Sequence, residues 1–587
     1  MKDLMVIWNT LSRCRNYSTA NVNSNPGEQD ETRTLSHVSN NIRRKSSIVV
    51  NRFLNTALPV HSNNRRRWPK YTFRLMILGL LSLASGCFLL LYRPYELLFN
   101  WKSTFGDGGE IFEMWRTPEV DLYLKVYLFN VTNRDEYLDG RDSKLRFQET
   151  GPYVYKETFQ HANVVFNDNG TLSAVPIHPL TYIPELSNGT EEDLLILPNI
   201  ALLSITNVMK DASYITRWGL NMLIRQTNSH PLVQMTAREF MFGYQSTLVT
   251  LGNHLMPAWI KFDKLGLIDR MYDFDGDFET IYTGETDIRL SGLIDKYNGD
   301  VNLPQWTGTC ANVHGASDGV KFPSYIKPND TLLFFRKSLC RSERMIRTGE
   351  KVIKGLYTYQ YTFMENELDN GAINPENKCF CRRGFCLKPG LIDVTDCYYG
   401  FPIALSYPHF YKADPSLLEA VEGLEPKKEL HESYFFIQPK SGAPVDLAFR
   451  FQINMALQNI GHLARVEKFD DLTLPLLWFE IGMYELPTHM NMRFWLYIHF
   501  LPILEEIMIY LLFLLGAMLL VWSVVRILSY QAKESPTEWL ETEIKRKRER
   551  VQNDKQNNLG AREMDTYSSL LILGDPNLAD VNLMVET

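Results

Sequence analysis

The sequence predicts an α+β membrane protein in which a large, mostly β domain lies between two membrane-spanning helices. Three observations support this prediction: two uncharged apolar runs, strand-like segments between them, and six of the eight cysteines gathered between residues 310 and 397. An even set of cysteines between two apolar spans is typical of a disulfide framework in an oxidising compartment. We therefore expect this domain to be luminal or extracellular.

Each apolar run is long enough to cross a bilayer as a helix. Residues 75–92 form an uncharged run of 18 residues and residues 507–525 one of 19, close to the length of about 20 that a bilayer requires. The first run is preceded by a polar segment too long for a signal peptide, so we expect a signal anchor. Basic residues precede the first run and follow the second: Arg65, Arg66, Arg67, Lys70, Arg74, Arg526 and Lys533. By the positive-inside rule, both termini are cytosolic and residues 93–506 lie outside.

The two tails differ in charge. Residues 1–74 contain 13 basic and 4 acidic residues and few periodic apolar ones, so we expect a basic, largely disordered segment whose membrane-adjacent part attracts anionic lipid. Residues 526–587 form the second cytosolic tail. There, Tyr567-Ser-Ser-Leu570 resembles a tyrosine-based sorting signal for a clathrin adaptor. Nucleic acid is excluded as a partner, because the basic stretch adjoins the membrane and lacks a binding motif.

Small residues recur on one face of the first apolar run. Gly79, Ser82 and Gly86 are spaced so that their side chains share one helix face, as in closely packed membrane helices. The alternative is that small residues are merely scattered in an apolar helix.

Between the runs, the pattern is strand, then helix, then strand. Residues 120–130 partly alternate apolar and polar side chains, and a second strand follows a turn at residues 150–156. Residues 197–253 carry apolar residues at helical spacing, interrupted at His230-Pro231. Strand signals return after Gly266 and continue to about Trp478. We expect a cluster of helices inserted in a mostly β domain.

Glycosylation sequons support the same topology. Four lie between the runs, at Asn130, Asn169, Asn188 and Asn329, where the glycosylation machinery would reach them. A fifth, at Asn16, lies on the cytosolic side and is expected to stay unmodified.

Several fragments resemble catalytic or metal-binding motifs. Gly315-Ala-Ser317-Asp-Gly319 fits G-x-S-x-G, with His314 before it, but no hydrophobic strand precedes it and no helix follows. Residues 273–279 (DFDGDFE) resemble a calcium loop, but Gly276 is not where an EF-hand requires it, so a solvated acidic turn is the better interpretation.

Zinc is the alternative to disulfides for the cysteines, but the chain contains neither a C-x2-C pair nor an H-x3-H pair. His431-Glu432 lacks the second histidine of H-E-x-x-H. We also find no nucleotide-binding loop. We therefore expect no catalytic residue, no metal ion and no cofactor.

A series of motifs resembles the class B scavenger receptor family, which includes the fatty-acid translocase, the high-density lipoprotein receptor, the lysosomal integral membrane protein and insect sensory neuron membrane proteins. The motifs run in order along nearly the whole segment between the apolar runs: YLFNVTN at 127–133, ETGPYVYKE at 149–157, TAREFMFGY at 236–244, GTC at 308–310, FPSYI at 322–326, SLCRS at 338–342, CFC at 379–381, YPHF at 407–410 and LPLLWFE at 474–480. The long tails fall outside the resemblance.

The resemblance implies an antiparallel β-barrel with a helical cap at about residues 197–253 and an internal tunnel leading toward the membrane. It also implies the disulfides Cys310–Cys379, Cys340–Cys397 and Cys381–Cys386, whereas six cysteines alone leave 15 pairings open. Cys14 and Cys87 would then remain reduced or become lipidated.

The function that the resemblance implies is that of a cell-surface receptor, not an enzyme. It would bind lipids or lipoprotein-like particles and transfer apolar ligand through the tunnel to the membrane. The protein would reside in the plasma membrane and also in endosomes or lysosomes, with a homo-oligomer as a further option. Two alternatives stay open: an endolysosomal sorting receptor for a protein partner, and a membrane-anchored lipid hydrolase that uses Ser317.

The cap departs from the pattern of fatty-acid-binding family members, which carry lysines near the end of a cap helix. Here the corresponding stretch runs from Arg225 to His230, with Arg225 as the fixed cation and His230 as a titrating one. Arg225 is able to bind a carboxylate through two hydrogen bonds, but the alternative is an ordinary surface charge near a helix end. We therefore expect a neutral or weakly polar ligand rather than a free fatty acid.

Overall fold

The computed structural model describes residues 70–107, 109–248, 250 and 264–560. The predictions for Cys14, Asn16, Tyr567 and Leu570 lie outside these residues. The chain divides into two compact units, of which the larger is Gly79–Met518; the smaller contains Met1–Leu78 and Leu519–Thr587. The larger unit carries the sheets and the candidate site.

A large, almost wholly antiparallel sheet forms the framework of the larger unit, which confirms the predicted α+β class. Within the described residues it contains 12 strands, and its main path runs β10-β11-β12-β16-β17-β18-β1-β2-β15. Among the strand pairs of this sheet in the described part of the chain, only the short pair of β15 and β2 is parallel. The bounds are β10 Leu332–Arg336, β11 Arg341–Ile353, β12 Leu356–Phe363, β16 Tyr434–Ile437, β17 Pro444–Ala456, β18 Thr473–Met483, β1 Leu122–Val131, β2 Leu145–Glu157, β15 Val421–Glu422, with β5 Leu180–Tyr182, β13 Ile392–Asp393 and β14 Ile403–Ser406 attached.

The path has two ends, β10 and β15, and within the described residues these strands do not pair with each other. The predicted closed barrel therefore stays a prediction.

The three central strands, β1, β17 and β18, carry a row of paired charges, and two of them are buried on both faces. Along β17 and β18 nearly every side chain is buried. The register places Lys125 of β1 and Arg450 of β17 on either side of Glu480 of β18. Lys125 Nζ lies 3.1 Å and Arg450 Nε 2.5 Å from the Glu480 carboxylate. Because a buried charge is costly unless paired, this row favours one register of the three strands.

Two smaller sheets complete the β structure. The first has the order β3-β4-β8-β9, and the second pairs β6 with β7. Their bounds are β3 Gln160–Phe166, β4 Thr171–Ile177, β8 Glu279–Tyr282, β9 Ile294–Tyr297, β6 Leu194–Pro198 and β7 Leu232–Thr236. The expectation of helix across residues 197–253 is wrong for residues 232–236, because this segment pairs with β6 as strand β7. Strands β6 and β7 frame the helical insertion.

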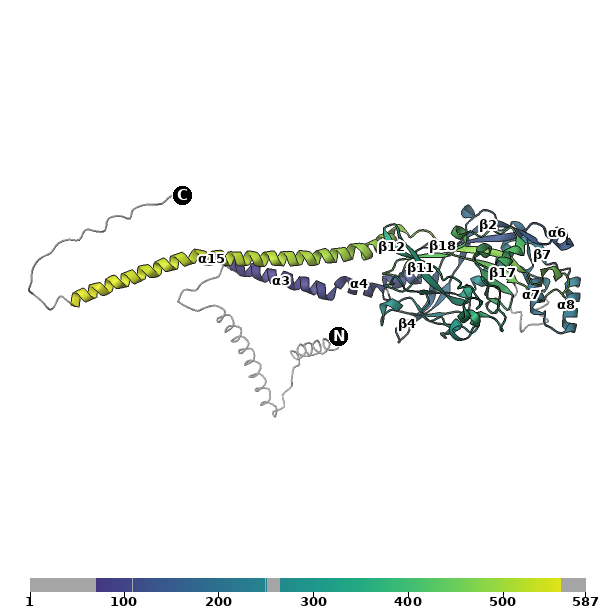
Figure 1. The fold of residues 1–587 in the computed structure, drawn as a ribbon, viewed down its shortest axis with the longest axis horizontal. Coiled ribbons are helices and arrows are strands. Elements are labelled where there is room, and N and C mark those ends of the chain that lie inside the picture. The colour runs from purple at the N-terminus through teal and green to yellow at the C-terminus, as the bar shows by residue number, and fades with distance from the viewer. Residues whose placement is uncertain (1–69, 108, 249, 251–263, 561–587) are drawn as a thin grey trace, which may run out of the picture. The chain divides into compact units, whose positions relative to one another are not determined.

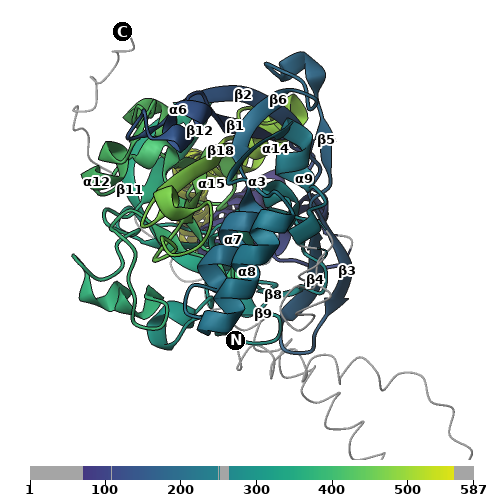
Figure 2. The same ribbon diagram turned by 90° about the vertical axis from the view of Figure 1, so that its right-hand side faces the viewer.

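The helices cluster at two places in the larger unit. Helices α7 and α8 lie at the end opposite α4 (Figures 1 and 2), and they fall within the stretch predicted to be helical. The helix bounds are α3 Lys70–Tyr92, α4 Pro94–Ser103, α5 Glu110–Arg116, α6 Arg134–Asp139, α7 Ile200–Val208, α8 Tyr214–Gln226, α9 Ala237–Phe242, α11 Leu267–Met271, α12 Pro415–Glu419, α13 Lys428–His431, α14 Thr488–Trp495 and α15 Leu501–Gly560. A π-helical turn, η9 Leu496–Phe500, joins α14 to α15.

Short 3-10 turns connect the other elements: η1 Pro184–Leu186, η2 Ile288–Leu290, η3 Gly308–Ala311, η4 Lys337–Leu339, η5 Pro375–Phe380, η6 Thr395–Cys397, η7 Pro408–Phe410 and η8 Glu467–Phe469.

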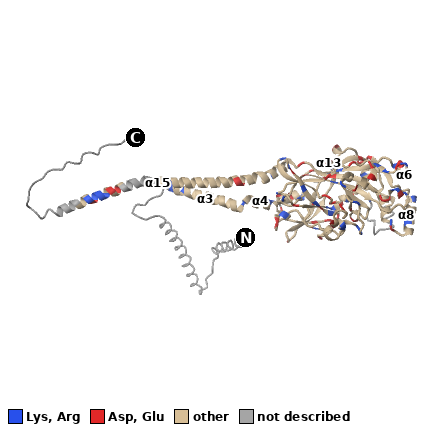
Figure 3. Ribbon diagram, in the orientation of Figure 1, with Lys and Arg blue, Asp and Glu red and all other residues tan. Residues whose placement is uncertain are grey.

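Helices α3 and α15 contain the two predicted membrane spans. Both are long and apolar enough to cross a membrane, and Figure 3 shows long stretches of each without a charged residue. Helix α15 has 60 residues, so it continues well beyond the predicted span at 507–525 into the predicted cytosolic tail.

The small-residue face of α3 packs against α15. Ser82 Oγ donates a hydrogen bond of 2.7 Å to the Leu512 carbonyl. A Cβ added to Gly516 would lie 2.7 Å from Leu83 Cγ, and one added to Gly86 would lie 3.3 Å from the Phe513 ring. The close approach of the two helices thus depends on small residues, which decides between the two interpretations of this face.

The six cysteines between the spans form three disulfides, Cys310–Cys379, Cys340–Cys397 and Cys381–Cys386, the pairing that the family resemblance implies. The first two join residues 69 and 57 positions apart, and the third joins residues 5 apart. Cys87 is free and exposed.

The long-loop disulfides are expected to contribute more to stability than the short one. In the chain-entropy model, a bridge across 57 residues constrains the unfolded chain by about 2 kcal/mol more than a bridge across 5. Replacing Cys340 and Cys397 together by alanine should therefore lower the thermal unfolding midpoint and the surface level more than replacing Cys381 and Cys386. Equal losses in the two double variants would contradict the loop-closure argument.

Candidate functional site

A largely apolar cavity lies between the large sheet and the helices next to the two apolar spans. Its volume is about 180 Å³, more than ten times the roughly 10–15 Å³ that one water molecule needs on the same measure. The apolar lining comes from strands β1, β10, β16, β17 and β18 and from α4, α5, α14 and η9: Phe99, Ile111, Met114, Trp115, Leu122, Phe334, Phe435, Leu447, Phe449, Ile481, Met483, Met490, Phe494, Tyr497 and Ile498. Such a lining suits an apolar ligand.

The position of the cavity follows from chain connectivity. Helix α4 begins two residues after α3 ends, and η9 ends immediately before α15 begins. Phe99 of α4 and Ile498 of η9 both line the cavity. One wall therefore consists of the segments that continue directly into the two candidate membrane spans.

Charged side chains occur on the helical wall. Lys102 of α4 and Arg493 of α14 both contact Glu110 of α5, at 3.2 and 3.4 Å. All three line the cavity, and their side chains are 29–50% exposed. The group carries one more cation than anion, so it would attract an anionic or polar headgroup.

A buried ionised carboxylate also borders the cavity. Glu157 accepts hydrogen bonds from Tyr272 at 2.7 Å and His178 at 2.5 Å, and its carboxylate lies 3.4 Å from Arg336. Burial alone would raise the pKa of Glu157, but the Arg336 charge and these hydrogen bonds lower it to about 2. Because this carboxylate is fully paired within the protein, it offers no binding capacity to a ligand.

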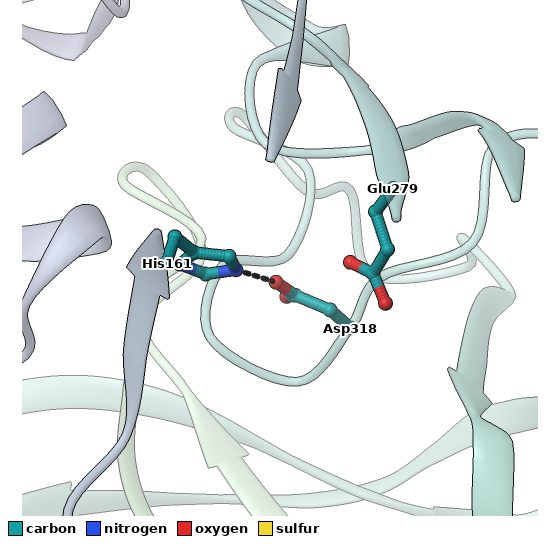
Figure 4. A group of neighbouring side chains, drawn as sticks. All are labelled: His161, Glu279 and Asp318. Carbon is teal, nitrogen blue, oxygen red and sulfur yellow. Dashed lines mark ion pairs between the residues drawn. The ribbon is translucent and has the colours of Figure 1, made fainter. Parts of the chain in front are cut away.

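A second buried cluster contains His161, Glu279 and Asp318 (Figure 4). Burial and the charges of Asp318 and Asp277 raise the pKa of Glu279 to about 8. Lys321, close by in sequence, is also buried, but its ammonium donates to the carbonyls of Ser291 and Phe322 and to Ser324. Burial lowers the pKa of Lys321 to about 7.

Comparison with known proteins identifies the family. The CD36 family matches residues 77–527. The chain belongs to the CD36 family. Scavenger receptor class B member 1 of Sus scrofa is 30% identical over 476 residues, which cover 80% of this chain and 92% of that protein. Protein peste of Drosophila melanogaster is 28% identical over 69% of this chain and 74% of its own length. Lysosome membrane protein 2 of Rattus norvegicus is 30% identical over 68% of this chain and 84% of its own length.

The resemblance seen in the sequence motifs is thereby confirmed, and the CD36 family match extends from within the first candidate membrane span to within the second. Membership of this receptor family also confirms that the protein is not an enzyme. The geometry of Ser317 agrees: the side chain is buried, its hydroxyl donates to the Lys321 carbonyl at 2.7 Å, and it accepts from Gly319 N–H at 3.0 Å. In this CD36-family chain, the G-x-S-x-G fragment forms a loop in which the serine is a structural residue.

The interpretation of residues 273–279 as a solvated turn is wrong for two of its four carboxylates. Asp277 forms an ion pair with Lys337 and its side chain is 12% exposed, while Glu279 is buried. The physical reason is that β8 begins at Glu279, so this side chain belongs to a sheet rather than to a surface loop. Asp273 pairs with Arg270 at 2.9 Å, and Asp275 is exposed as expected.

The two predicted ligand-capture residues lie in different environments. Arg225 is exposed in the last turn of α8, and it forms no ion pair within the described part of the chain. His230 is partly buried, and its Nε2 lies 3.3 Å from Arg465 Nη1. Burial and the charge of Arg465 lower the pKa of His230, so Arg225 is the more favourable cation of the two at neutral pH.

An internal tunnel was expected from the family resemblance, but the residues that line the cavity were not predicted, because they come from segments as distant as Phe99 and Ile498. The sequence nevertheless contains a signal that could have indicated the helical part of this lining. The segments flanking the spans, residues 95–115 and 486–498, are rich in aromatic residues and methionine, as expected for the wall of an apolar site.

The four sequons between the spans are expected to carry glycans. Asn169, Asn188 and Asn329 are exposed, whereas Asn130 is half-buried and accepts a hydrogen bond from Ile196 N–H at 2.9 Å. Glycosidase treatment and peptide mapping of the membrane-expressed protein should find modification at all four and none at Asn16. A glycan on Asn16 would contradict the proposed orientation.

Proposed function

We propose that this protein is a cell-surface receptor that binds lipids or lipid-carrying particles and passes apolar ligand through an internal tunnel to the membrane. The observation that supports this most directly is the apolar cavity whose helical wall continues into both candidate spans. In this proposal residues 93–506 lie outside the cell, both termini are cytosolic, and the large sheet encloses the tunnel as a barrel.

Burial of an acyl chain or sterol provides the affinity. Each CH2 group that leaves water contributes about 0.8 kcal/mol, so ten buried groups would contribute about 8 kcal/mol. Polar contacts then need only orient the ligand. Lys102 and Arg493 on the helical wall would orient a polar or anionic headgroup, because Glu110 neutralises only one of these two cations.

Ligand capture is proposed at the opposite end, on α8. Tyr214, Ile215, Trp218 and Met222 are 53–77% exposed, and their spacing places them toward one side of the helix. A group of large exposed apolar side chains on one helix is typical of a binding surface. The occupant that we propose is the surface of a lipid particle, since α8 lies away from the helices that adjoin the candidate spans (Figures 1 and 2).

Filling the cavity is expected to block lipid transfer. Ala443 and Leu447 both line the cavity, so Ala443→Phe and Leu447→Trp would occupy its space without overpacking a filled core. Uptake of a fluorescent cholesteryl ester should fall several-fold at matched surface expression. Ala372→Phe is the matched control, because Ala372 is exposed and does not line the cavity.

Unchanged uptake in the cavity variants, with normal folding, would contradict the tunnel. If the Ala372→Phe control lost as much ester uptake as the cavity variants, the loss would instead indicate a general effect of a larger side chain.

Apolar and charged residues of the cap are expected to have separable roles. Ile215→Glu with Trp218→Glu should weaken particle binding for all lipid classes, whereas Leu186→Glu with Val352→Glu, at apolar positions elsewhere that are 55% and 62% exposed, should not. Arg225→Ala with His230→Ala should weaken uptake of anionic lipids more than of neutral ones. Equal loss for both lipid classes, or no loss for either, would exclude a role for the cap's cations.

An endolysosomal sorting receptor is the second candidate, supported by the relative named lysosome membrane protein 2. In that case, the α8 surface would bind a protein partner, and an adaptor would bind at Tyr567 and Leu570. Localisation of the full-length protein distinguishes the candidates, since steady-state residence in lysosomes would favour the second.

A further inference from the structure

Three buried side chains from distant parts of the chain converge beside the cavity. His161 is the second residue of β3, Glu279 the first of β8, and Asp318 lies in the loop before β10. Their potential ligand atoms all lie within 4.8 Å of one another, and Figure 4 shows the imidazole and both carboxylates directed toward a common space. The His161 side chain is 0% and the Asp318 side chain 8% exposed.

Sheet register explains how two of these residues meet. His161 is opposite Pro176 of β4 on one side, and Glu279 is opposite Ala174 of β4 on the other. Positions 174 and 176 are two apart, so both side chains lie on the same face of the sheet. Strands β3 and β8 are then about 9.5 Å apart, and between them β4 presents only the small side chains of Ala174 and Pro176 on this face. The sheet therefore leaves room for an ion above Ala174.

Each of the three side chains has an unpartnered acceptor atom. His161 Nε2, Glu279 Oε2 and Asp318 Oδ2 are buried and have no hydrogen-bond partner within the described chain. His161 Nε2 and Asp318 Oδ2 are 3.6 Å apart, too far for a hydrogen bond. An unsatisfied buried acceptor costs about 1–3 kcal/mol, and three such atoms converge here.

The orientation of His161 favours a metal ligand. Its Nδ1 lies 3.0 Å from the Trp115 carbonyl, to which it donates, so the lone pair of Nε2 faces the two carboxylates. The ring also stacks on the Trp115 indole, with centroids 3.6 Å apart. A backbone carbonyl that fixes the far ring nitrogen is the usual outer partner of a metal-binding histidine.

The neighbouring cations are already engaged. Arg336 pairs with Glu157, Lys337 pairs with Asp277, and Lys321 donates to two carbonyls and a hydroxyl. Within the described residues none of these three cations forms an ion pair with Glu279 or Asp318, and one divalent cation would balance both carboxylates in their ionised form.

We propose that His161 Nε2 and the carboxylates of Glu279 and Asp318 bind a divalent transition-metal ion of the Zn²⁺ type. One imidazole with two carboxylates suits zinc better than Ca²⁺ or Mg²⁺, which prefer all-oxygen sites. Ligand atoms around a tetrahedral zinc ion are about 3.3 Å apart; His161 Nε2 and Asp318 Oδ2, at 3.6 Å, are close to that spacing, and all three ligand atoms lie within 4.8 Å of one another. The sequence alone predicted no metal ion. The proposed ion would join β3, β8 and the loop at residues 315–320 at the cavity wall.

The test uses the full-length protein purified in detergent and passed over a chelating resin. Bound metal is measured by elemental analysis after incubation with ZnCl2, and the thermal unfolding midpoint is measured against free Zn²⁺. We expect about one zinc ion per chain and a midpoint that rises with zinc concentration. Parallel titrations with CaCl2 and MgCl2 should give no comparable rise.

Asp318→Asn and Glu279→Gln preserve side-chain shape and should each abolish the bound zinc and the zinc-dependent rise. Without metal both variants should unfold at or above the wild-type midpoint, since an amide of the same shape adds no charge to the buried cluster. Asp275→Asn with His314→Gln is the matched control, because both residues are exposed and lie outside the cluster. Absence of zinc in the wild type, equal zinc in all variants, or tighter binding of Ca²⁺ than of Zn²⁺ would overturn the proposal.

Discussion

The antiparallel pairing of β1 with β18 is the constraint on which the rest of the structure depends. It places Tyr123, near the start of β1, opposite Gly482, near the end of β18. Residues that are far apart in the sequence but adjoin the two apolar helices are thus brought to the same end of the central strands. Because α4 and α5 precede β1 while α14 follows β18, the segments next to both spans come together and enclose the cavity between themselves and the sheet.

The charged groups of the larger unit are of two kinds: those paired within the protein and those available to a ligand. The row of Lys125, Glu480 and Arg450 stabilises the pairing of three central strands, and the Glu157–Arg336 pair satisfies its charges within the protein. Neither group has binding capacity left for a ligand. The wall of α4, α5 and α14 instead carries a surplus cation, so apolar surface would determine affinity while this charge orients the ligand.

Much of the architecture could be predicted from the sequence, because its signals are local. Uninterrupted apolar runs define the spans, apolar spacing defines α7 and α8, and ordered motifs define the family. Contacts between distant segments left no such signal. Residues 273–279 were interpreted as a solvated turn from local composition alone, although Glu279 begins a buried strand. Asp318 was considered only as part of a serine motif, whereas the fold directs it toward His161.

The central claim is that an apolar ligand occupies the cavity beside the membrane helices, and photo-crosslinking tests it most directly. The full-length protein in membranes would be loaded with a sterol that carries a diazirine on its apolar end, irradiated, digested and mapped by mass spectrometry. The account predicts labelling in the peptides of β17, β18 and α14, competed by excess unlabelled sterol. Competable labelling confined to α8, or to the lipid-facing surfaces of α3 and α15, would contradict it.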